Sequence, residues 1–191
     1  MKLAILLSIA SSVLASSQCG IRIAEEPGRH ERAVIGSDDA PKGRWPWQIY
    51  LAPRFCGGTV ISDRWILTAA HCVENREMQY VVYDGISHRN ESMLDEDPEN
   101  VVKSNVTEIK THPDYINGTL RPSPGDIALL KLSTPFTFNH LVTPICLPSL
   151  SQPIQDDGHA VITGFGLANE KGPYNSTRVK VTFGQLKETN V

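Results

Sequence analysis

One histidine and one aspartate have neighbours that suit acid–base chemistry. His71 ends the run Leu67-Thr68-Ala69-Ala70-His71 and is followed by a cysteine. Asp126 stands at the mouth of the apolar stretch Ile127–Leu132. An isolated histidine is as compatible with a structural role as with catalysis, but an imidazole next to an orienting carboxylate can accept a proton near neutral pH. The pair supplies two of the three groups of a nucleophilic triad.

The third group, a serine in a glycine-rich turn, is not found between Asp126 and Val191. Ser123 lies between prolines, and Ser133 follows an apolar stretch. Neither belongs to a turn that offers paired backbone amides to an oxyanion. Loss of one triad member lowers the rate by several orders of magnitude, so we expect these residues alone to be an incompetent hydrolase.

The composition indicates a small globular unit built from strands. The chain has 191 residues, of which 40% are hydrophobic, enough for one domain with a core. The 14 glycines and 13 prolines favour short strands and turns over a helical bundle. The net charge of −3 and the lack of a basic run give no reason to expect a nucleic-acid partner.

Short apolar or alternating runs separated by turn residues predict an all-β sandwich or barrel. They cover Gln48–Leu51, Gly57–Ile61, Trp65–Leu67, Tyr80–Tyr83, Val106–Lys110 and Ile127–Leu132, with one helical turn at Ala69–Val73. The extended, proline-bracketed segment Val142–Pro148 is interpreted as a linker. Beyond it, Ala160–Gly166 and Arg178–Phe183 are expected to pair as a hairpin. Because a lone hairpin is marginal in water, we interpret this as the start of a second domain.

The N-terminus has the pattern of a secretory signal. Lys2 precedes the apolar region Leu3–Leu14, and small residues near Ala15 suit cleavage, so residues 1–17 are assigned to the signal. A membrane anchor is the alternative, but the run is shorter than the ~20 apolar residues of a span. We therefore expect a secreted, extracellular protein that does not span a membrane. Four sequons, at Asn90, Asn105, Asn117 and Asn175, lie in polar stretches interpreted as turns and are predicted glycosylation sites.

The four cysteines of an exported chain suggest two disulfides, with three pairings possible. Cys56 precedes Cys72 by 16 residues, and a bridge between them could staple the loop that presents His71. Zinc is the alternative, but no CxxC or HExxH spacing exists. The acidic stretch 91–100 could hold calcium through Asp95, Glu96, Asp97 and Glu99, or form a solvated loop. No other cofactor is expected.

In chain order, the motifs resemble those of the chymotrypsin-like (trypsin-like) serine peptidases. They are Trp45-Pro46-Trp47-Gln48, Cys56-Gly57-Gly58, Thr68-Ala69-Ala70-His71-Cys72, Asp126-Ile127-Ala128-Leu129-Leu130, Pro144-Ile145-Cys146-Leu147-Pro148 and Gly164-Phe165-Gly166. The resemblance runs from Ala33 to about Phe183. It implies a chymotrypsin-like antiparallel β-barrel carrying histidine and aspartate at 33–145, with a linker and the opening hairpin of an incomplete second barrel at 146–191.

The resemblance also implies roles for individual residues. His71 is similar to the family's general base and Asp126 to its orienting carboxylate. Cys56–Cys72 resembles the bridge beside the histidine, and Cys19–Cys146 resembles the bridge that retains a cleaved activation peptide. That peptide would be residues 18–32, with cleavage between Arg32 and Ala33. A mature chain starting at Val34 is the alternative, although it breaks the rule of cleavage after arginine.

Two functions follow from these expectations. The first is a secreted serine-type endopeptidase that acts on polypeptide substrates and meets polypeptide inhibitors, present here as a truncated chain that lacks the family's Gly-Asp-Ser-Gly-Gly nucleophile. The second is a secreted non-catalytic pseudo-peptidase that uses the first barrel as a binding module.

Overall fold

A computed structural model describes residues 19–22, 38–40, 42–86, 101–118, 123–149, 161–165 and 187–190. Within these ranges the chain forms β-strands and one short 3-10 helix. They are β1 (Asp38–Asp39), β2 (Gln48–Ala52), β3 (Cys56–Val60), β4 (Trp65–Thr68), η1 (Ala70–Val73), β5 (Val81–Asp84), β6 (Val102–Thr111), β7 (Ala128–Leu132), β8 (Val161–Gly164) and β9 (Lys187–Asn190). No helix in this part of the chain is long and apolar enough to cross a membrane.

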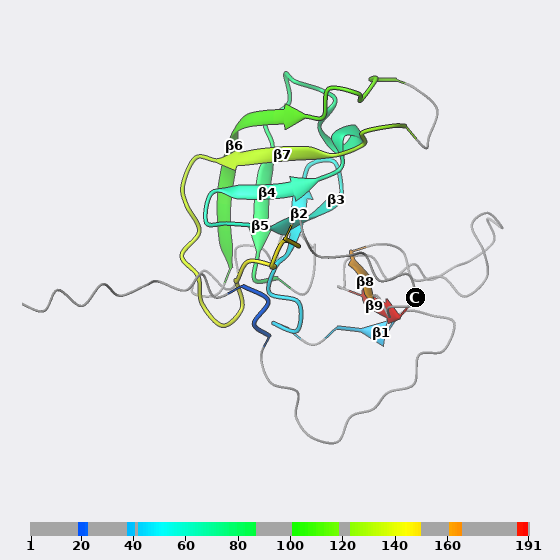
Figure 1. Cartoon of the computed structure of the whole chain (residues 1–191). Coiled ribbons are helices and arrows are strands. Elements are labelled where there is room, and N and C mark those ends of the chain that lie inside the picture. Colours follow the sequence, from blue (N-terminus) through cyan, green and yellow to red (C-terminus); the bar gives the residue numbers. More distant parts are fainter. Residues whose placement is uncertain are drawn as a thin grey trace, which may run out of the picture.

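Strands β2 to β7 close into an antiparallel barrel in the order β2-β3-β4-β7-β6-β5 (Figure 1). The barrel closes where β2 pairs with β5, with Tyr50 opposite Tyr83. The all-β prediction is therefore confirmed, and each of the six predicted runs from Gln48 to Leu132 overlaps one barrel strand, with ends shifted by a few residues. The predicted helical turn is also present, as η1.

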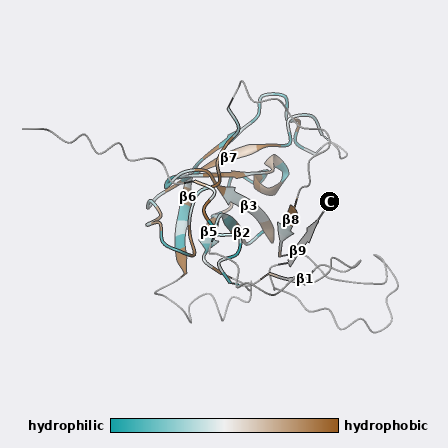
Figure 2. Cartoon of the chain, turned by 60° about the horizontal axis from the view of Figure 1, so that its bottom comes forward, coloured by the Kyte–Doolittle hydropathy of each residue, from teal (hydrophilic) through white to brown (hydrophobic). Residues whose placement is uncertain are grey.

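The barrel core follows from the two-residue period of its strands. On β7, Ala128, Leu130 and Leu132 are buried, whereas the side chains between them are only partly covered. Successive side chains of a strand point to opposite faces, so one face of β7 lines the interior. The fully buried core residues include Ile49, Leu51, Val60, Ile66, Val73 and Val82. Figure 2 shows hydrophobic stretches along the barrel strands. Burial of each such side chain contributes about 1.5–3 kcal/mol to the free energy of unfolding.

Strand β6 is longer than its apolar pattern predicted, and it corrects one expectation. It begins at Val102 rather than Val106, and its pairing with β7 shifts register between Val106 and Glu108. Asn105, expected in a turn, therefore lies within a strand. The polar side chains Lys103, Asn105 and Thr107 alternate on the solvent face of β6, which made the sequence resemble a turn.

A second, three-stranded antiparallel sheet has the order β1-β9-β8 and lies beside the barrel (Figure 1). Strand β8 confirms the strand predicted within Ala160–Gly166. Its neighbour in the described chain is β9, with Val161 opposite Asn190 and Gly164 opposite Lys187. The segment Arg178–Phe183, expected to pair with β8, lies outside the described residues. Strand β1, from the part of the sequence assigned to the first barrel, pairs with β9.

Two kinds of contact join β8 to the barrel. The Thr163 hydroxyl donates a hydrogen bond to Gln48 Oε1 at 2.5 Å. Phe165, directly after β8, packs edge-on against Tyr50, with ring centroids 5.9 Å apart. Phe165 and Tyr50 belong to a small apolar group, here called the aromatic cluster, which consists of Ala40, Trp45, Tyr50, Ile86 and Phe165. This cluster is separate from the main barrel core.

Candidate active site

The position of His71 is set by the end of β4. The Thr68 hydroxyl donates to the Gly57 carbonyl on β3 at 2.7 Å, which fixes the last residue of β4. Ala69 then continues in an extended conformation, with φ −81° and ψ 143°. The chain turns into η1, where the Cys72 amide donates to the Ala69 carbonyl at 3.2 Å. Ala70 and Cys72 are buried on either side of His71, whose side chain is 25% exposed.

Asp126 is aimed by a tight turn before β7. Gly125 has φ +64°, a conformation that side chains with a Cβ rarely adopt. The Ile127 amide donates to the Gly125 carbonyl at 2.6 Å, so the turn closes around Asp126. The Ile127 carbonyl in turn accepts a hydrogen bond from the His112 amide at 3.0 Å, which holds the turn against the end of β6.

The two predicted catalytic residues lie together although 55 positions separate them. The Nδ1 atom of His71 is 2.7 Å from Oδ2 of Asp126, and the His71 backbone amide donates to Oδ1 at 2.9 Å. Both carboxylate oxygens therefore contact one residue. An ionised carboxylate only accepts hydrogen bonds, so Nδ1 carries the hydrogen and Nε2 is left as the basic nitrogen. With side-chain exposures of 25% and 24%, both groups are reachable from solvent.

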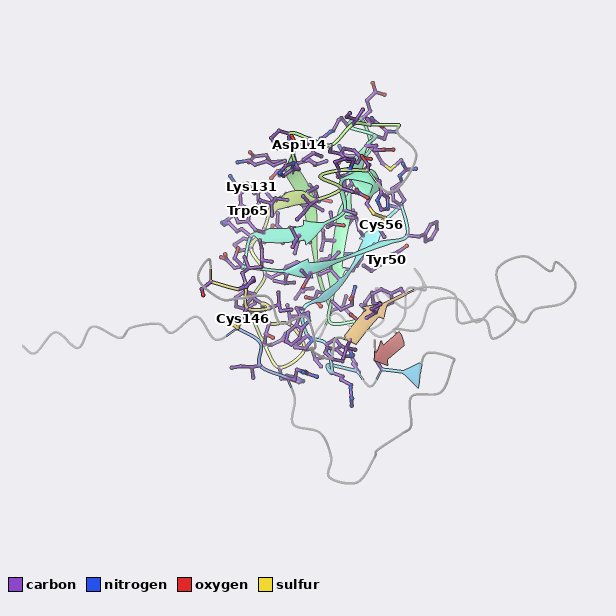
Figure 3. The ribbon with its side chains drawn as sticks, turned by 45° about the vertical axis from the view of Figure 1, so that its right-hand side comes forward. Tyr50, Cys56, Trp65, Asp114, Lys131 and Cys146 are labelled. Atoms are coloured by element: carbon purple, nitrogen blue, oxygen red, sulfur yellow. A yellow bond between two sulfur atoms is a disulfide. The ribbon has the colours of Figure 1, made fainter. Side chains whose placement is uncertain are left out.

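A disulfide lies beside this pair. Cys56 and Cys72 are bonded, with their Cα atoms 6.1 Å apart, so the predicted bridge next to His71 is confirmed. The sulfur atoms and a ring nitrogen of His71 lie within 4.8 Å of one another. This grouping resembles a metal site, but disulfide sulfurs are not thiolate ligands. The bridge instead ties η1 to β3 (Figure 3 labels Cys56).

A group of hydrogen bonds next to the site was not predicted from the sequence. Glu74 directly follows η1, and its Oε1 accepts hydrogen bonds from the Tyr115 hydroxyl and from the Gly118 amide. Arg76 donates to the Ile109 carbonyl at 3.2 Å and to the Thr111 hydroxyl at 3.1 Å. The segment that follows η1 is therefore bonded to β6 and to the loop leading toward Asp126. These contacts join positions more than 30 residues apart, and no local pattern marks them.

The two serines considered as nucleophiles have hydrogen bonds to other groups. The Ser123 hydroxyl donates to the Pro124 carbonyl at 3.4 Å. Ser133 lies 3.3 Å from Ser104 in a group of hydroxyls that caps the other end of β7. Within the described ranges no serine hydroxyl hydrogen-bonds to His71.

A different carboxyl group is buried away from the pair. Asp84 ends β5, is 1% exposed, and accepts a hydrogen bond from the Gly85 amide at 2.6 Å through Oδ1. Its Oδ2 atom is buried without a hydrogen-bond partner among the described residues. Burial raises the pKa of Asp84 well above its ordinary value, and the Gly85 hydrogen bond offsets this only in part.

The remaining predicted site residues divide into two groups. Cys19–Cys146 is bonded, which confirms the second predicted bridge. Asn105 and Asn117 are exposed, as a glycan acceptor must be. The other predicted positions, Arg32, Ala33, Asn90, Asn175 and the acidic stretch 91–100, lie outside the described residues.

Comparison with known proteins agrees with this geometry. The family model described as Trypsin matches residues 34–190. An ovochymase from Halocynthia roretzi is 35% identical over 161 residues, which cover 81% of this chain and 10% of that protein. The chain therefore belongs to the trypsin family of chymotrypsin-like serine peptidases. It spans about a tenth of the length of this curated relative.

Proposed function

We propose that the chain is the His–Asp half of a secreted serine-type endopeptidase. The observation that carries the proposal is the placement of Asp126, whose two oxygens contact the Nδ1 atom and the backbone amide of His71 at 2.7 and 2.9 Å. This arrangement fixes both the tautomer and the orientation of the ring. A serine peptidase requires both.

In the proposed reaction His71 acts as the general base. Its Nε2 atom accepts the proton of a serine hydroxyl while the hydroxyl oxygen attacks the carbonyl carbon of a peptide bond. The imidazolium that forms is stabilised by Asp126 and then donates its proton to the leaving amine. A water molecule, activated by the same nitrogen, releases the acyl group.

The serine must come from outside these residues. The sequence contains no Gly-Asp-Ser-Gly-Gly motif, and the described serines do not contact His71. We therefore propose that the 191 residues alone do not hydrolyse peptide bonds. Polypeptide substrates and polypeptide inhibitors are the proposed partners of the product that carries the serine.

A covalent probe tests this assignment. The purified 191-residue chain is expected to resist labelling by a fluorophosphonate, whereas a chain extended by the downstream reading frame should be labelled. His71→Ala in the extended chain should abolish labelling, and His140→Ala, an exposed histidine elsewhere, should not. Labelling of the short chain would contradict the proposed inactivity. An extended frame without a reactive serine would favour the non-catalytic binding module.

We also propose that the protein is exported, glycosylated and activated by cleavage after Arg32. The two disulfides and the exposure of Asn105 and Asn117 support export. The Cys19–Cys146 bridge would keep the N-terminal segment attached after cleavage. Treatment of the secreted protein with a peptide-N-glycosidase should increase its electrophoretic mobility. Asn105→Gln and Asn117→Gln should each remove one step of that change, and unchanged mobility would refute glycosylation.

A further inference from the structure

The N-terminal segment 19–22 is attached to the barrel by more than its disulfide. The Gly20 amide donates to the Pro144 carbonyl at 2.8 Å. The Thr143 hydroxyl donates to the Ile21 carbonyl at 3.1 Å. The segment therefore lies beside residues 143–146, joined by one backbone–backbone hydrogen bond and by one hydrogen bond from the Thr143 side chain. Figure 1 shows this segment, in blue, next to the linker that follows the barrel.

Arg22 extends this contact to a pair of tryptophans. Its guanidinium carbon lies 4.4 Å from the ring centroid of Trp45 and 6.0 Å from that of Trp47. The two rings are themselves edge-to-face, with centroids 6.1 Å apart. Trp45 is only 7% exposed and belongs to the aromatic cluster. The cation–π attraction is stronger when the ring is largely buried than when it lies at an open surface.

The surface that receives the segment is held in place by the barrel. The Trp45 carbonyl accepts a hydrogen bond from the Gln48 amide at 2.9 Å, and the Trp47 carbonyl accepts one from the Val60 amide at 2.9 Å. The Thr143 amide donates to the Pro46 carbonyl at 2.7 Å. The tryptophan pair and residues 143–144 are thus fixed to each other independently of Arg22, so a docked peptide need not organise them.

We propose that Trp45, Trp47 and residues 143–144 form a docking site for an extended, arginine-bearing peptide, and that the chain's own residues 19–22 fill it. Arg22 is the anchor of this docking, and the site retains the segment when the Cys19–Cys146 bridge is opened. Residues 23–37 join the segment covalently to the rest of the chain when the bridge is open, so the docking is intramolecular. The proposal needs no catalytic group and goes beyond the proposed peptidase function.

The test uses the full chain labelled with 5-fluorotryptophan. The three tryptophans give separate fluorine resonances, assigned with Trp47→Phe and Trp65→Phe. Trp65 is an internal reference, because it packs near Lys110 and Lys131 and lies away from Cys146 (Figure 3). The variants are Cys19→Ser with Cys146→Ser, the same pair with Arg22→Ala or Arg22→Lys, and the exposed Arg54→Ala as the matched control.

The double serine variant is expected to keep the Trp45 resonance near its wild-type position. Adding Arg22→Ala should shift it toward an undocked position, with a docking constant about three- to thirty-fold lower. Arg22→Lys should fall between the two, and Arg54→Ala should have no effect. Equal Trp45 resonances for the double serine variant with and without Arg22→Ala would overturn the proposal.

A second measurement covers the case in which the double serine variant does not fold, as judged by its Trp65 resonance. In the disulfide-bonded chain, Arg22→Ala should speed hydrogen exchange at the Gly20 amide, which donates to Pro144. Arg54→Ala should leave this exchange rate unchanged. An exchange rate that Arg22→Ala does not alter would likewise overturn the proposal, because the disulfide alone would then account for the position of the segment.

Discussion

The barrel and the three-stranded sheet hold their shape in different ways. The barrel closes on itself through six strands, encloses fully buried side chains such as Ile66 and Leu130, and is pinned by Cys56–Cys72. The small sheet is open, and on β8 the side chains of Val161 and Ile162 are 40% and 60% exposed. Both residues of the predicted catalytic pair, His71 and Asp126, belong to the barrel region. The barrel alone therefore forms the His71–Asp126 pair, without help from the second sheet.

The two regions meet at the aromatic cluster, a small group of buried side chains that is distinct from the main barrel core. Apart from the Gln48–Thr163 hydrogen bond, they meet through the aromatic cluster, in which Phe165 packs on Tyr50. The barrel therefore contains both the main core and the His71–Asp126 pair.

Asp126→Asn tests the catalytic side of the barrel and should have the largest effect. In a chain that carries the serine, kcat should fall by about 10⁴-fold, a magnitude carried over from the same constellation in the family. The asparagine amide cannot act as an acceptor at both positions toward His71, so the wrong tautomer is favoured. Hydrolysis of a peptide substrate measures this. The exposed Asp114→Asn is the control, and an equal loss there would remove the special role of Asp126.

Leu130→Ala and Ile162→Ala compare the two regions directly. Leu130 is fully buried in the barrel, so its truncation should lower the free energy of unfolding by about 2–5 kcal/mol. Ile162 is 60% exposed on β8, and its truncation should change that free energy by about 0.5 kcal/mol or less. Urea unfolding at neutral pH measures both. Similar losses at the two positions would mean that the small sheet is as tightly packed as the barrel.

Replacing Cys56 and Cys72 together by serine tests the disulfide beside His71. The bridge closes a loop of 16 residues, so the loop-entropy model gives a loss of about 3 kcal/mol. Thermal unfolding with and without a thiol reductant measures this loss. Without reductant the variant should be the less stable chain, and with reductant, which also opens Cys19–Cys146 in both chains, the two stabilities should be similar. If the variant were about as stable as the wild type, the barrel would not depend on this disulfide.

Gly125→Ala tests the turn that aims Asp126. A non-glycine residue at φ +64° costs about 1–2 kcal/mol, and the added Cβ would lie 2.8 Å from Nδ1 of His112. Gly118→Ala is the matched control, because it has φ +75° with nothing within 4 Å of the added Cβ. The difference between the two variants isolates the contact with His112. Equal unfolding free energies would mean that His112 moves aside without cost.

Asp84→Asn tests the buried carboxyl through pH. Burial raises the folded-state pKa of Asp84 above its ordinary value of 3.8, so its protonated form favours folding. That stability is fully present below about pH 3.8 and is lost as pH rises through the raised pKa. The variant cannot ionise, so its stability relative to the wild type should increase with pH over the range above about pH 3.8. Thermal unfolding across that range measures this, with the exposed Asp63→Asn as the control.

Much of the barrel could be predicted because its strands follow a local pattern. The apolar runs of β2 to β7 alternate with turn residues, so their existence and approximate bounds follow from the sequence. Strand β6 was predicted too short, since its polar solvent-facing residues conceal the period until the pairing with β5 and β7 is known. The motifs around His71 and Asp126 also pointed to the pair, through the family resemblance.

The sequence by itself determined the residue types of the site, the all-β class and a cysteine count that allows two bridges. Only the tertiary structure decided that Asp126 uses both oxygens on His71, that Glu74 joins Tyr115 and Gly118, and that Arg22 lies over Trp45. Strand periods are local and can be read along the chain. Each of these contacts joins residues more than 20 positions apart, so it depends on how the chain folds back on itself and not on a local period.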